Sequence, residues 1–289
     1  MKLGIVILQY NGYTQTIELI STLKKMNWNN IEPKYIIVDN DSPDKSGTKI
    51  VDRYKNDNSV KIIEANQNLG FARGNNLGIK YSFRDFGADL TVVSNSDIDI
   101  KDRNFFQKLR STYLNEHFAV CGPDIYSLSK KFHQSPLRKK HYSKNELDNL
   151  IQNYKRKIRL LELIKPFKIY DFIWSLRRKL KIKSRAIESK NFQTKQHNVV
   201  LCGAFFILSR KYFEAYPNGL YDKTFMYLEE DALSIQCERK GLTVLYEPNL
   251  SILHYDGLST LRANKNRINK YLFELKNTIA SAEEVKKMF

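Results

Sequence analysis

Cysteine is scarce in this chain of 289 residues, which contains only Cys121, Cys202 and Cys237. The three are odd in number and far apart, and they show none of the spacings of metal-binding cysteines. This scarcity excludes a disulfide-stapled fold and a cysteine-ligated zinc site. We expect three buried thiols in a reducing compartment.

Long apolar runs are also missing. The longest uncharged apolar run, residues 199–208, is about half of the ~20 residues that a membrane-spanning helix requires. The apolar run at residues 3–8 ends in Gln9 and is too short for the apolar region of a signal peptide. We therefore expect no membrane-spanning segment and no leader, and a buried first strand at residues 3–8.

Acidic residues are too few to balance the basic ones in one segment. The formal net charge is +17, from 48 Lys and Arg against 31 Asp and Glu. Residues 129–197 hold 20 of those basic residues and only 5 of the acidic ones, so the rest of the chain is nearly neutral. No zinc finger, helix-turn-helix or base-stacking motif accompanies this charge, so we expect no nucleic-acid partner.

Apolar runs alternate with stretches of helical periodicity, which is typical of an α/β fold with a mostly parallel central sheet flanked by helices. In such sheets, ligands bind outside the carboxyl ends of the strands. The expected strands are residues 3–8, 35–38, 60–64, 90–93, 119–126, 199–209, 244–246 and 251–254. The expected helices are residues 14–26, 48–55, 73–82, 105–114, 211–216 and 232–240, with a helical tail from residue 266.

Two of these strands end in polar side chains at that edge. Asp39 and Asn40 follow the second strand, and Asn95, Ser96 and Asp97 follow the fourth. Hard divalent cations take oxygen ligands and often share them with phosphate groups. Two acidic strand ends on one side of a sheet therefore suggest a site for a nucleotide diphosphate and a cation.

The basic segment divides the chain. We expect a nucleotide-sugar-binding half at residues 1–128, a basic helical insertion at 129–197, a catalytic and acceptor half at 198–265, and a C-terminal helix at 266–289. Two amphipathic helices are expected in the insertion, at residues 147–161 and 169–180; the second contains Phe172 and Trp174, and Phe167 precedes it. Such helices could lie on an anionic membrane surface, or pack on the body of the protein or on a second subunit in a homodimer.

Seven short motifs occur in a fixed order: Tyr10-Asn11; Val38-Asp39-Asn40-x-Ser42; Asn66-x-Asn68-Leu69-Gly70-Phe71-Ala72-x-Gly74-Asn75-Asn76-x-Gly78; Asn95-Ser96-Asp97; Gly203-Ala204; Phe225-x-Tyr227-x-Glu229-Glu230-Asp231; and His254-x-x-Gly257-x-Ser259. With them the chain resembles the family 2 glycosyltransferases of the Rossmann-like GT-A fold. The resemblance is strongest to the rhamnosyltransferase-like members of cell-surface polysaccharide synthesis. It covers residues 3–128 and 199–260 but not the insertion.

The resemblance implies a donor pocket for a nucleotide-diphosphate sugar. Its residues would be Tyr10, Asn11, Asp39, Asn40, Asn68, Gly70, Arg73, Asn75, Asn95 and Ser96. Asp39 would accept hydrogen bonds from the nucleobase, although Asp is equally suited to cap a turn or helix. Arg73 or Asn75 would lie near the diphosphate or the sugar. Gly203 and Ala204 would lie on the acceptor side.

The resemblance also implies a Mn²⁺ or Mg²⁺ cofactor. The family's cation motif usually reads Asp-x-Asp, whereas Asn95 stands in the first position here, so Asp97 should be the main carboxylate ligand. Asp99 is a weaker candidate, because it lies two residues further along the chain. His254 would complete the protein ligands through a neutral ring nitrogen.

The catalytic base should come from Glu229, Glu230 and Asp231. The family pattern is Glu-Asp-x-Asp, so Glu230 takes the base position without a gap and Asp231 takes it with one inserted residue. We favour Asp231, because its shorter side chain matches the usual base. Acidic residues are also stabilised at a helix N-terminus by the helix dipole, so the two roles can coexist.

The expected activity is inverting transfer of a sugar from a UDP or dTDP donor, with dTDP-rhamnose as one candidate, to a glycan or lipid-linked glycan. The enzyme would work at the cytoplasmic face of a bacterial membrane. A sugar nucleotidyltransferase is an alternative, but its usual basic, glycine-rich loop after the first strand is missing. The other alternative is a non-catalytic nucleotide-sugar-binding scaffold.

Overall fold

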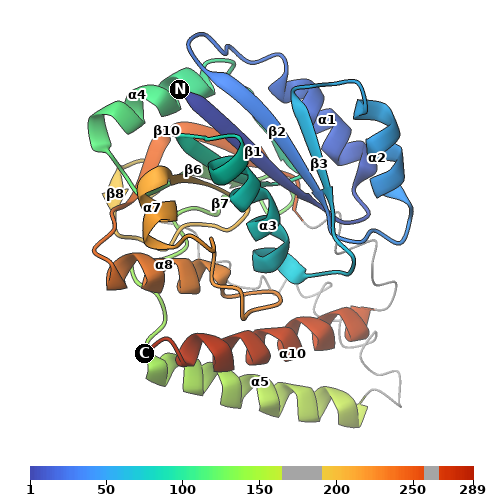
Figure 1. Cartoon of the computed structure of the whole chain (residues 1–289). Coiled ribbons are helices and arrows are strands. Elements are labelled where there is room, and N and C mark those ends of the chain that lie inside the picture. Colours follow the sequence, from blue (N-terminus) through green and yellow to red (C-terminus); the bar gives the residue numbers. More distant parts are fainter. Residues whose placement is uncertain (165–190, 257–266) are drawn as a thin grey trace.

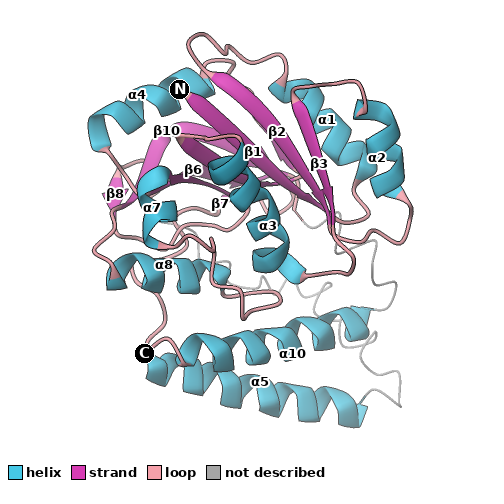
Figure 2. Cartoon of the chain, viewed as in Figure 1, coloured by secondary structure: helices cyan, strands magenta, loops and turns pink. Residues whose placement is uncertain are grey.

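A computed structural model describes residues 1–164, 191–256 and 267–289, and these form a mixed α/β architecture around one curled sheet (Figures 1 and 2). In the described residues the sheet has ten strands, with the order β3-β2-β1-β4-β9-β6-β10-β5. Strand β7 pairs with β6 and β8 pairs with β10, off this path. The predicted α/β fold with helices on both faces of a central sheet is confirmed.

The first four long strands are parallel and contain the predicted apolar runs. Helices connect them, because a parallel pair needs a crossover; α1 and α2 lie on one face of the sheet and α3 lies on the other. The elements are β1 (Lys2–Gln9), α1 (Tyr13–Leu23), β2 (Glu32–Asp39), α2 (Ser46–Tyr54), β3 (Val60–Glu64), α3 (Gly70–Lys80), the π-helical turn η1 (Tyr81–Asp85) and β4 (Leu90–Asn95).

The second part of the sheet is mixed. Strand β9 runs antiparallel to both β4 and β6, whereas β6 and β10 are parallel to each other. The elements are β5 (Ile98–Asp99), α4 (Phe105–Glu116), β6 (Val120–Ser127), β7 (Phe132–His133), α5 (Lys144–Ile164), β8 (Gln196–His197), β9 (Phe205–Ser209), α7 (Arg210–Ala215), α8 (Glu229–Arg239), β10 (Val244–His254) and α10 (Arg267–Lys286).

Each face of the sheet is covered by its own apolar core. Helices α1, α2 and α4 cover one face through residues such as Leu19, Ile50 and Phe106. Helices α3, α7 and α8 cover the other through residues that include Phe213 and Leu233. Because both faces are buried, the parallel strands are continuous apolar runs rather than alternating ones.

In Figure 1, helix α8 lies between the sheet and the pair formed by helices α5 and α10. Leu233 and Cys237 face the core on the sheet. Ala232 and Ile235 instead join a third cluster with residues of α5 and α10, including Leu147 and Ala282. With apolar neighbours on two sides, α8 has a fixed position, and so does its acidic N-terminal turn.

Two expected elements differ from the structure. Residues 199–204, expected as strand, precede β9, because Val200 makes only an isolated bridge to Arg138 and the chain turns at Gly203. The two expected strands at 244–246 and 251–254 are one strand, β10. Its register shifts between Glu247 and Ser251, at Pro248, which has no N–H for the ladder.

The first part of the expected insertion lies on the body of the protein. Strand β7 pairs with β6, and Arg138 bridges to Val200 before α5 begins. We define residues 129–143 as the strap. The second expected helix, with Phe172 and Trp174, falls outside the described residues, as does Phe167. Within the described residues, no helix has both the length and the apolar character needed to cross a membrane.

Candidate functional site

The polar strand ends share one edge of the sheet. Gln9 pairs with Asp39 across β1 and β2, and Leu8 pairs with Asn95 across β1 and β4. Neighbouring strands are about 4.8 Å apart, so Asp39 and Asn95 lie about two strand spacings from each other. The predicted convergence of Asp39 with the segment that carries Asp97 is therefore present at the level of the backbone.

Asp39 holds the loop between β2 and α2. Its Oδ1 accepts hydrogen bonds from Gln9 Nε2 at 2.7 Å and from Ser42 Oγ at 2.6 Å. A Cβ on Gly47 would lie only 2.3 Å from Asp39 Oδ2, so this oxygen lies against the start of α2. These contacts are those of a buried turn-capping carboxylate, the alternative role that the sequence left open.

Asn40 and Asn68 fasten the start of α3 to the end of β2. Asn40 Nδ2 donates to Asn68 Oδ1 at 3.0 Å, and Asn40 Oδ1 accepts from the N–H of Leu69 at 2.9 Å. Gly70 has a φ of +77°, and a Cβ there would lie 2.1 Å from the carbonyl oxygen of Phe225. Gly70 is thus required by both its backbone conformation and the close approach of the loop before α8.

The other predicted donor-side residues differ in exposure. Asn75 is fully buried and donates to the carbonyl of Phe71 at 3.0 Å, whereas Arg73 is exposed and donates to the carbonyl of Leu69 at 3.1 Å. Half-buried Tyr10 follows β1. The Asn11 N–H donates to Ser42 Oγ at 3.0 Å, so this loop lies beside the Asp39 turn.

Asn95, Ser96 and Asp97 lead from β4 across to the far strands. The Asn95 N–H donates to the carbonyl of Ala204 at 2.9 Å. The site of a Cβ on Gly12 lies 3.2 Å from Ser96 Oγ, which places Ser96 beside the loop after β1. Strand β5 follows Asp97 directly and pairs with the end of β10, so His254 lies opposite Ile98.

This crossing brings Asp97 and His254 together. Asp97 Oδ1 lies 3.3 Å from His254 Nε2, and both side chains are about nine-tenths buried. The two atoms are not aligned for a hydrogen bond, and His254 Nε2 has no hydrogen-bond partner among the residues that the structure describes. A buried nitrogen without a partner is costly unless something binds there.

The arrangement fits a divalent cation between a carboxylate and an imidazole. Neighbouring ligands in an octahedral shell with bonds of about 2.1 Å lie roughly 3 Å apart, close to the observed separation. Within the described ranges, no group of three or more His, Cys, Asp or Glu side chains is arranged to hold a metal ion. Two protein ligands suit an ion whose remaining ligands are waters and substrate phosphates, as is usual for Mg²⁺.

Asp99, the weaker cation candidate, is engaged elsewhere. Its Oδ2 accepts a charged hydrogen bond from Lys101 Nζ at 2.5 Å and lies 3.5 Å from the hydroxyl of Tyr255. Asp99 also sits in β5, paired with Leu253. These contacts occupy its carboxylate near the surface.

Gln134 and Asp256 lie behind His254, and neither was among the predicted site residues. His254 Nδ1 donates to Gln134 Oε1 at 2.8 Å, and Gln134 Nε2 donates to Asp256 Oδ1 at 2.7 Å. Asp256 also accepts from Ser127 Oγ and, at 2.9 Å, from Ser129 Oγ. Gln134 belongs to the basic segment and to no motif, so no sequence pattern pointed to it.

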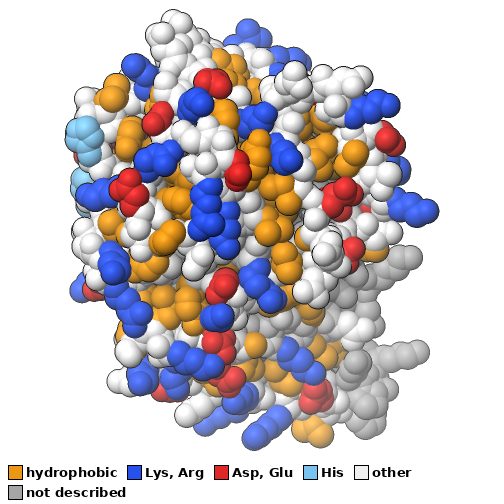
Figure 3. All heavy atoms as spheres, viewed as in Figure 1, with side chains coloured by type: hydrophobic (Ala, Val, Ile, Leu, Met, Phe, Trp, Pro, Cys, Tyr) orange, Lys and Arg blue, Asp and Glu red, His pale blue; other side chains and the backbone are white. Residues whose placement is uncertain are grey.

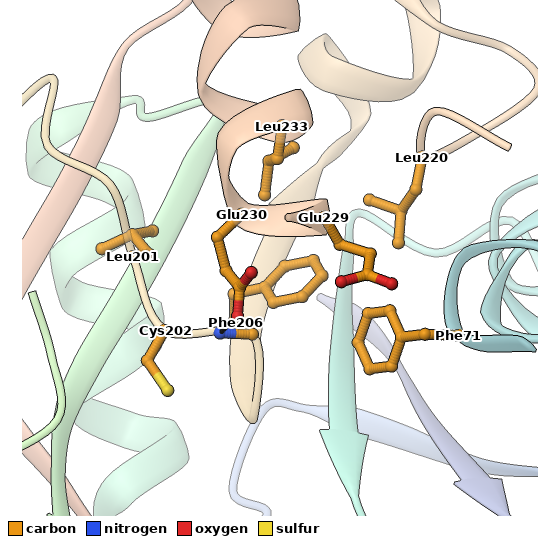
Figure 4. A pocket seen from close by; sticks show the side chains of 9 residues that line it. Phe71, Leu201, Cys202, Phe206, Leu220, Glu229, Glu230 and Leu233 are labelled. Carbon is orange, nitrogen blue, oxygen red and sulfur yellow. Dashed lines mark hydrogen bonds between the residues drawn. The ribbon is translucent and has the colours of Figure 1, made fainter. Parts of the chain in front are cut away.

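Glu229 and Glu230 begin α8 and line a small pocket (Figure 4). The Glu229 carboxylate lies near Phe71 and Leu220, and its Oε1 is buried without a partner among the described residues. Glu230 Oε1 accepts from the N–H of Gly203 at 3.2 Å. A Cβ on Gly203 would lie 2.7 Å from that oxygen, so only glycine lets the two approach.

Asp231 faces the strap rather than this pocket. Its Oδ2 forms an ion pair with Arg138, and its Oδ1 accepts from the N–H of Tyr142 at 2.9 Å. The Asp231 side chain is 1% exposed, and Arg138 also lies over the ring of Tyr142 at 4.0 Å. The residue favoured from sequence as the base therefore has both carboxylate oxygens engaged.

The pocket favours the protonated form of its two glutamates. Burial raises the pKa of Glu229, and the neighbouring charge of Glu230 raises it further. Burial also raises the pKa of Glu230; the Asp231 charge adds to the shift, whereas the Gly203 N–H and the Arg138 charge oppose it. A carboxyl group that can change charge near neutral pH is suited to proton transfer.

Gly203 and Ala204 lie between the start of α8 and the end of β4. Gly203 contacts Glu230, and the next residue accepts the backbone hydrogen bond from Asn95. Two adjacent residues thus join the start of α8 to the segment that carries Asp97.

Residues 4–216 of the chain match the model of glycosyl transferase family 2. The low-salt glycan biosynthesis hexosyltransferase Agl10 of Haloferax volcanii is 22% identical over 123 residues, which are 43% of this chain and 36% of that protein. The chain thus spans about a third of the length of that relative.

Two solved structures share the fold. S. aureus TarS 1–349 in complex with UDP-GlcNAc has a TM-score of 0.57 and 11% identity, over 98% of this chain and 66% of that one. Mannosyltransferase PcManGT from Pyrobaculum calidifontis, in complex with GDP-Man and Mn²⁺, has a TM-score of 0.52 and 10% identity, over 98% and 73%. These likenesses confirm the GT-A architecture.

The raised pKa of Glu229 predicts how stability depends on pH. A carboxyl group with a higher pKa in the folded state binds its proton more tightly there, so its contribution to stability is fully present below the unfolded pKa, about 4.3, and is lost as pH rises through the folded pKa. Glu229→Gln should therefore raise the unfolding temperature at pH 7 to 8 and change it little at pH 4. Thermal unfolding across this pH range measures the effect, and an equal shift at every pH would contradict the assignment.

Proposed function

The chain belongs to glycosyl transferase family 2, and from this membership and the site we propose that it is a metal-dependent inverting glycosyltransferase. The proposed reaction moves a hexose or deoxyhexose from a nucleotide-diphosphate donor to a glycan or a lipid-linked glycan. TarS and PcManGT, whose structures contain UDP-GlcNAc and GDP-Man, support a nucleotide-sugar donor. A UDP or dTDP donor, with dTDP-rhamnose as one candidate, remains the expectation from the motifs.

One observation carries this proposal: Asp97 Oδ1 and His254 Nε2 face each other at 3.3 Å, and within the described part of the chain Nε2 has no hydrogen-bond partner. Asp97 and His254 would hold Mn²⁺ or Mg²⁺, and Asn95 lies two residues before Asp97 at the same strand end. When bound, such an ion supplies a Lewis acid for the departing diphosphate. The structure of PcManGT in complex with GDP-Man and Mn²⁺ supports a divalent ion in this proposal.

We assign the base to Glu230 rather than Asp231. Asp231 is engaged by Arg138 and Tyr142, whereas Glu230 lies in the pocket and contacts Gly203, next to the residue that bonds Asn95. In the proposed step, the acceptor oxygen attacks the anomeric carbon and its proton passes to the Glu230 carboxylate. The bond from that carbon to the diphosphate oxygen breaks, and the diphosphate keeps the electron pair.

The donor pocket is proposed at the shared strand edge. Tyr10, Asn11 and Ser96 border it, and Asn40, Asn68 and Gly70 fix its wall at the start of α3. Asp39 shapes the loop through Gln9 and Ser42, and any base contact would add to these bonds. Arg73 is exposed on α3 and donates to the carbonyl of Leu69, beside this wall.

We propose that the exposed side of α5, which belongs to the expected insertion, binds an anionic membrane surface. Leu160 is 60% exposed and Leu163 is 70% exposed, and Arg156 and Arg159 are exposed on the same side of the helix. Figure 3 shows Lys and Arg spread over this face of the molecule, including the region of α5 and α10. Basic residues near such a surface contribute about 1 kcal/mol each.

Asp97→Ala tests the cation site. Without the carboxylate, Mn²⁺ should no longer strengthen nucleotide binding, because His254 alone is a weak site. Calorimetric titration of UDP, dTDP and their sugars, with and without Mn²⁺, measures this in the wild type and the variant. Equal Mn²⁺ stimulation in both proteins would sink the proposal, and binding without turnover in the presence of every acceptor would favour the scaffold alternative.

Glu230→Gln should leave donor binding intact and reduce transfer by about 10²–10⁴-fold, the usual contribution of a general base. Asp231→Asn should mainly reduce stability, because it removes the charge that pairs with Arg138. The measurements are donor titration, release of nucleotide diphosphate, and thermal unfolding. Loss of transfer in a stably folded Asp231→Asn, with activity retained in Glu230→Gln, would return the base to Asp231.

The membrane surface is tested by sedimentation with vesicles of phosphatidylcholine, alone or mixed with phosphatidylglycerol. The wild type should sediment only with the anionic vesicles, and replacement of Leu160 and Leu163 by Ser should weaken this several-fold. Leu114→Ser, at a residue 52% exposed on α4, is the matched control and should bind as the wild type does. Unchanged sedimentation of the double variant contradicts the proposal, and a doubled mass by light scattering supports the homodimer instead.

A further inference from the structure

Neutral His254 carries one ring proton, and two neighbours compete for it. Gln134 Oε1 accepts from Nδ1 at 2.8 Å, whereas Asp97 Oδ1 lies 3.3 Å from Nε2 without hydrogen-bond alignment. If Nε2 carried the proton, its lone pair would no longer be available to a cation. The acceptor on the Nδ1 side therefore decides whether His254 can be a ligand.

Asp256 fixes which end of the Gln134 amide faces the histidine. An ionised carboxylate only accepts hydrogen bonds, so the Gln134 NH₂ group must point to Asp256 Oδ1, at 2.7 Å. The Gln134 carbonyl is then turned toward His254 Nδ1. The opposite orientation would place two acceptors, the amide oxygen and the carboxylate, against each other.

Asp256 is surrounded by hydrogen-bond donors. Ser127 Oγ and Ser129 Oγ both donate to its Oδ2, and Gln134 Nε2 donates to its Oδ1. Lys130 Nζ also lies 3.7 Å from Asp256 Oδ1. With donors on both oxygens, Asp256 acts as the acceptor toward the Gln134 amide.

We propose that Gln134, oriented by Asp256, is a positioning residue that keeps the proton of His254 on Nδ1 and so leaves Nε2 open to a divalent cation. This inference rests on the proposed function, in which His254 and Asp97 hold that cation. Through Gln134, the strap contributes to the proposed cation site. Ligating histidines usually donate their second ring N–H to such a partner, and loss of the partner typically weakens metal binding by about 10–100-fold.

The test compares Mn²⁺ binding of the full chain in the presence of UDP, measured from the electron paramagnetic resonance of free Mn²⁺. Gln134→Leu should weaken binding about 10–100-fold. The matched control is Gln107→Leu, because Gln107 donates to the carbonyls of Asn27 and Asn29 on another part of the surface. It should bind as the wild type does, and Asp97→Ala should not bind. If Gln134→Leu does not fold, Gln134→Met removes the same acceptor with a side chain of similar length.

A second measurement distinguishes positioning from a merely structural role. The ¹⁵N shifts of the His254 ring, assigned by their loss in His254→Asn, should report Nδ1–H in the wild type above pH 8 and a shift toward Nε2–H in Gln134→Leu. Unchanged shifts and unchanged Mn²⁺ affinity in Gln134→Leu would overturn the inference. Failure of the wild type itself to bind Mn²⁺ with UDP would instead overturn the proposed function.

Discussion

The site depends on one close approach, between Asp97 Oδ1 and His254 Nε2. Two buried atoms with lone pairs repel each other at 3.3 Å unless a proton or a cation lies between them. The fold holds them there in spite of this cost, because β5 and β10 pair directly beside them and the Tyr255 N–H donates to the carbonyl of Asp97. A backbone ladder thus fixes a geometry that the side chains alone would not adopt.

A second unfavourable arrangement lies at the start of α8. Three acidic residues are adjacent there, and Glu229 and Glu230 lie in a largely apolar pocket. Arg138 offsets part of this charge through Asp231, and two apolar clusters hold the helix from both sides. Unfavourable burial that persists because the surroundings enforce it is common at functional sites. Here it is concentrated in the pocket in which we propose the proton acceptor.

The fold was predictable because its apolar strands are long and buried on both faces, as at residues 3–8 and 35–38. The strand ends were predictable because Asp39 and Asp97 interrupt such runs abruptly. The contacts of Asp231 and Asp39 were not, because only the structure shows that Arg138 engages the first and Gln9 the second. Gln134 and Arg138 were missed because they lie among basic residues without periodicity, and because His254 and Asp231, which they contact, are 120 and 93 positions away in the chain.

The residues of the site come from distant parts of the chain. Asp97 belongs to the half that contains the parallel strands, His254 ends the last strand, and Gln134 lies between them in the chain. The family match ends at residue 216 and does not include Glu230 or His254, so the roles proposed for these two residues rest on their geometry. Because β10 reaches the site only by pairing with β6 and β5, residues 1–128 contain Asp97 without the ring that faces it. The two halves and the strap therefore act together, and the pairing of Asp97 with His254 is a property of the completed sheet.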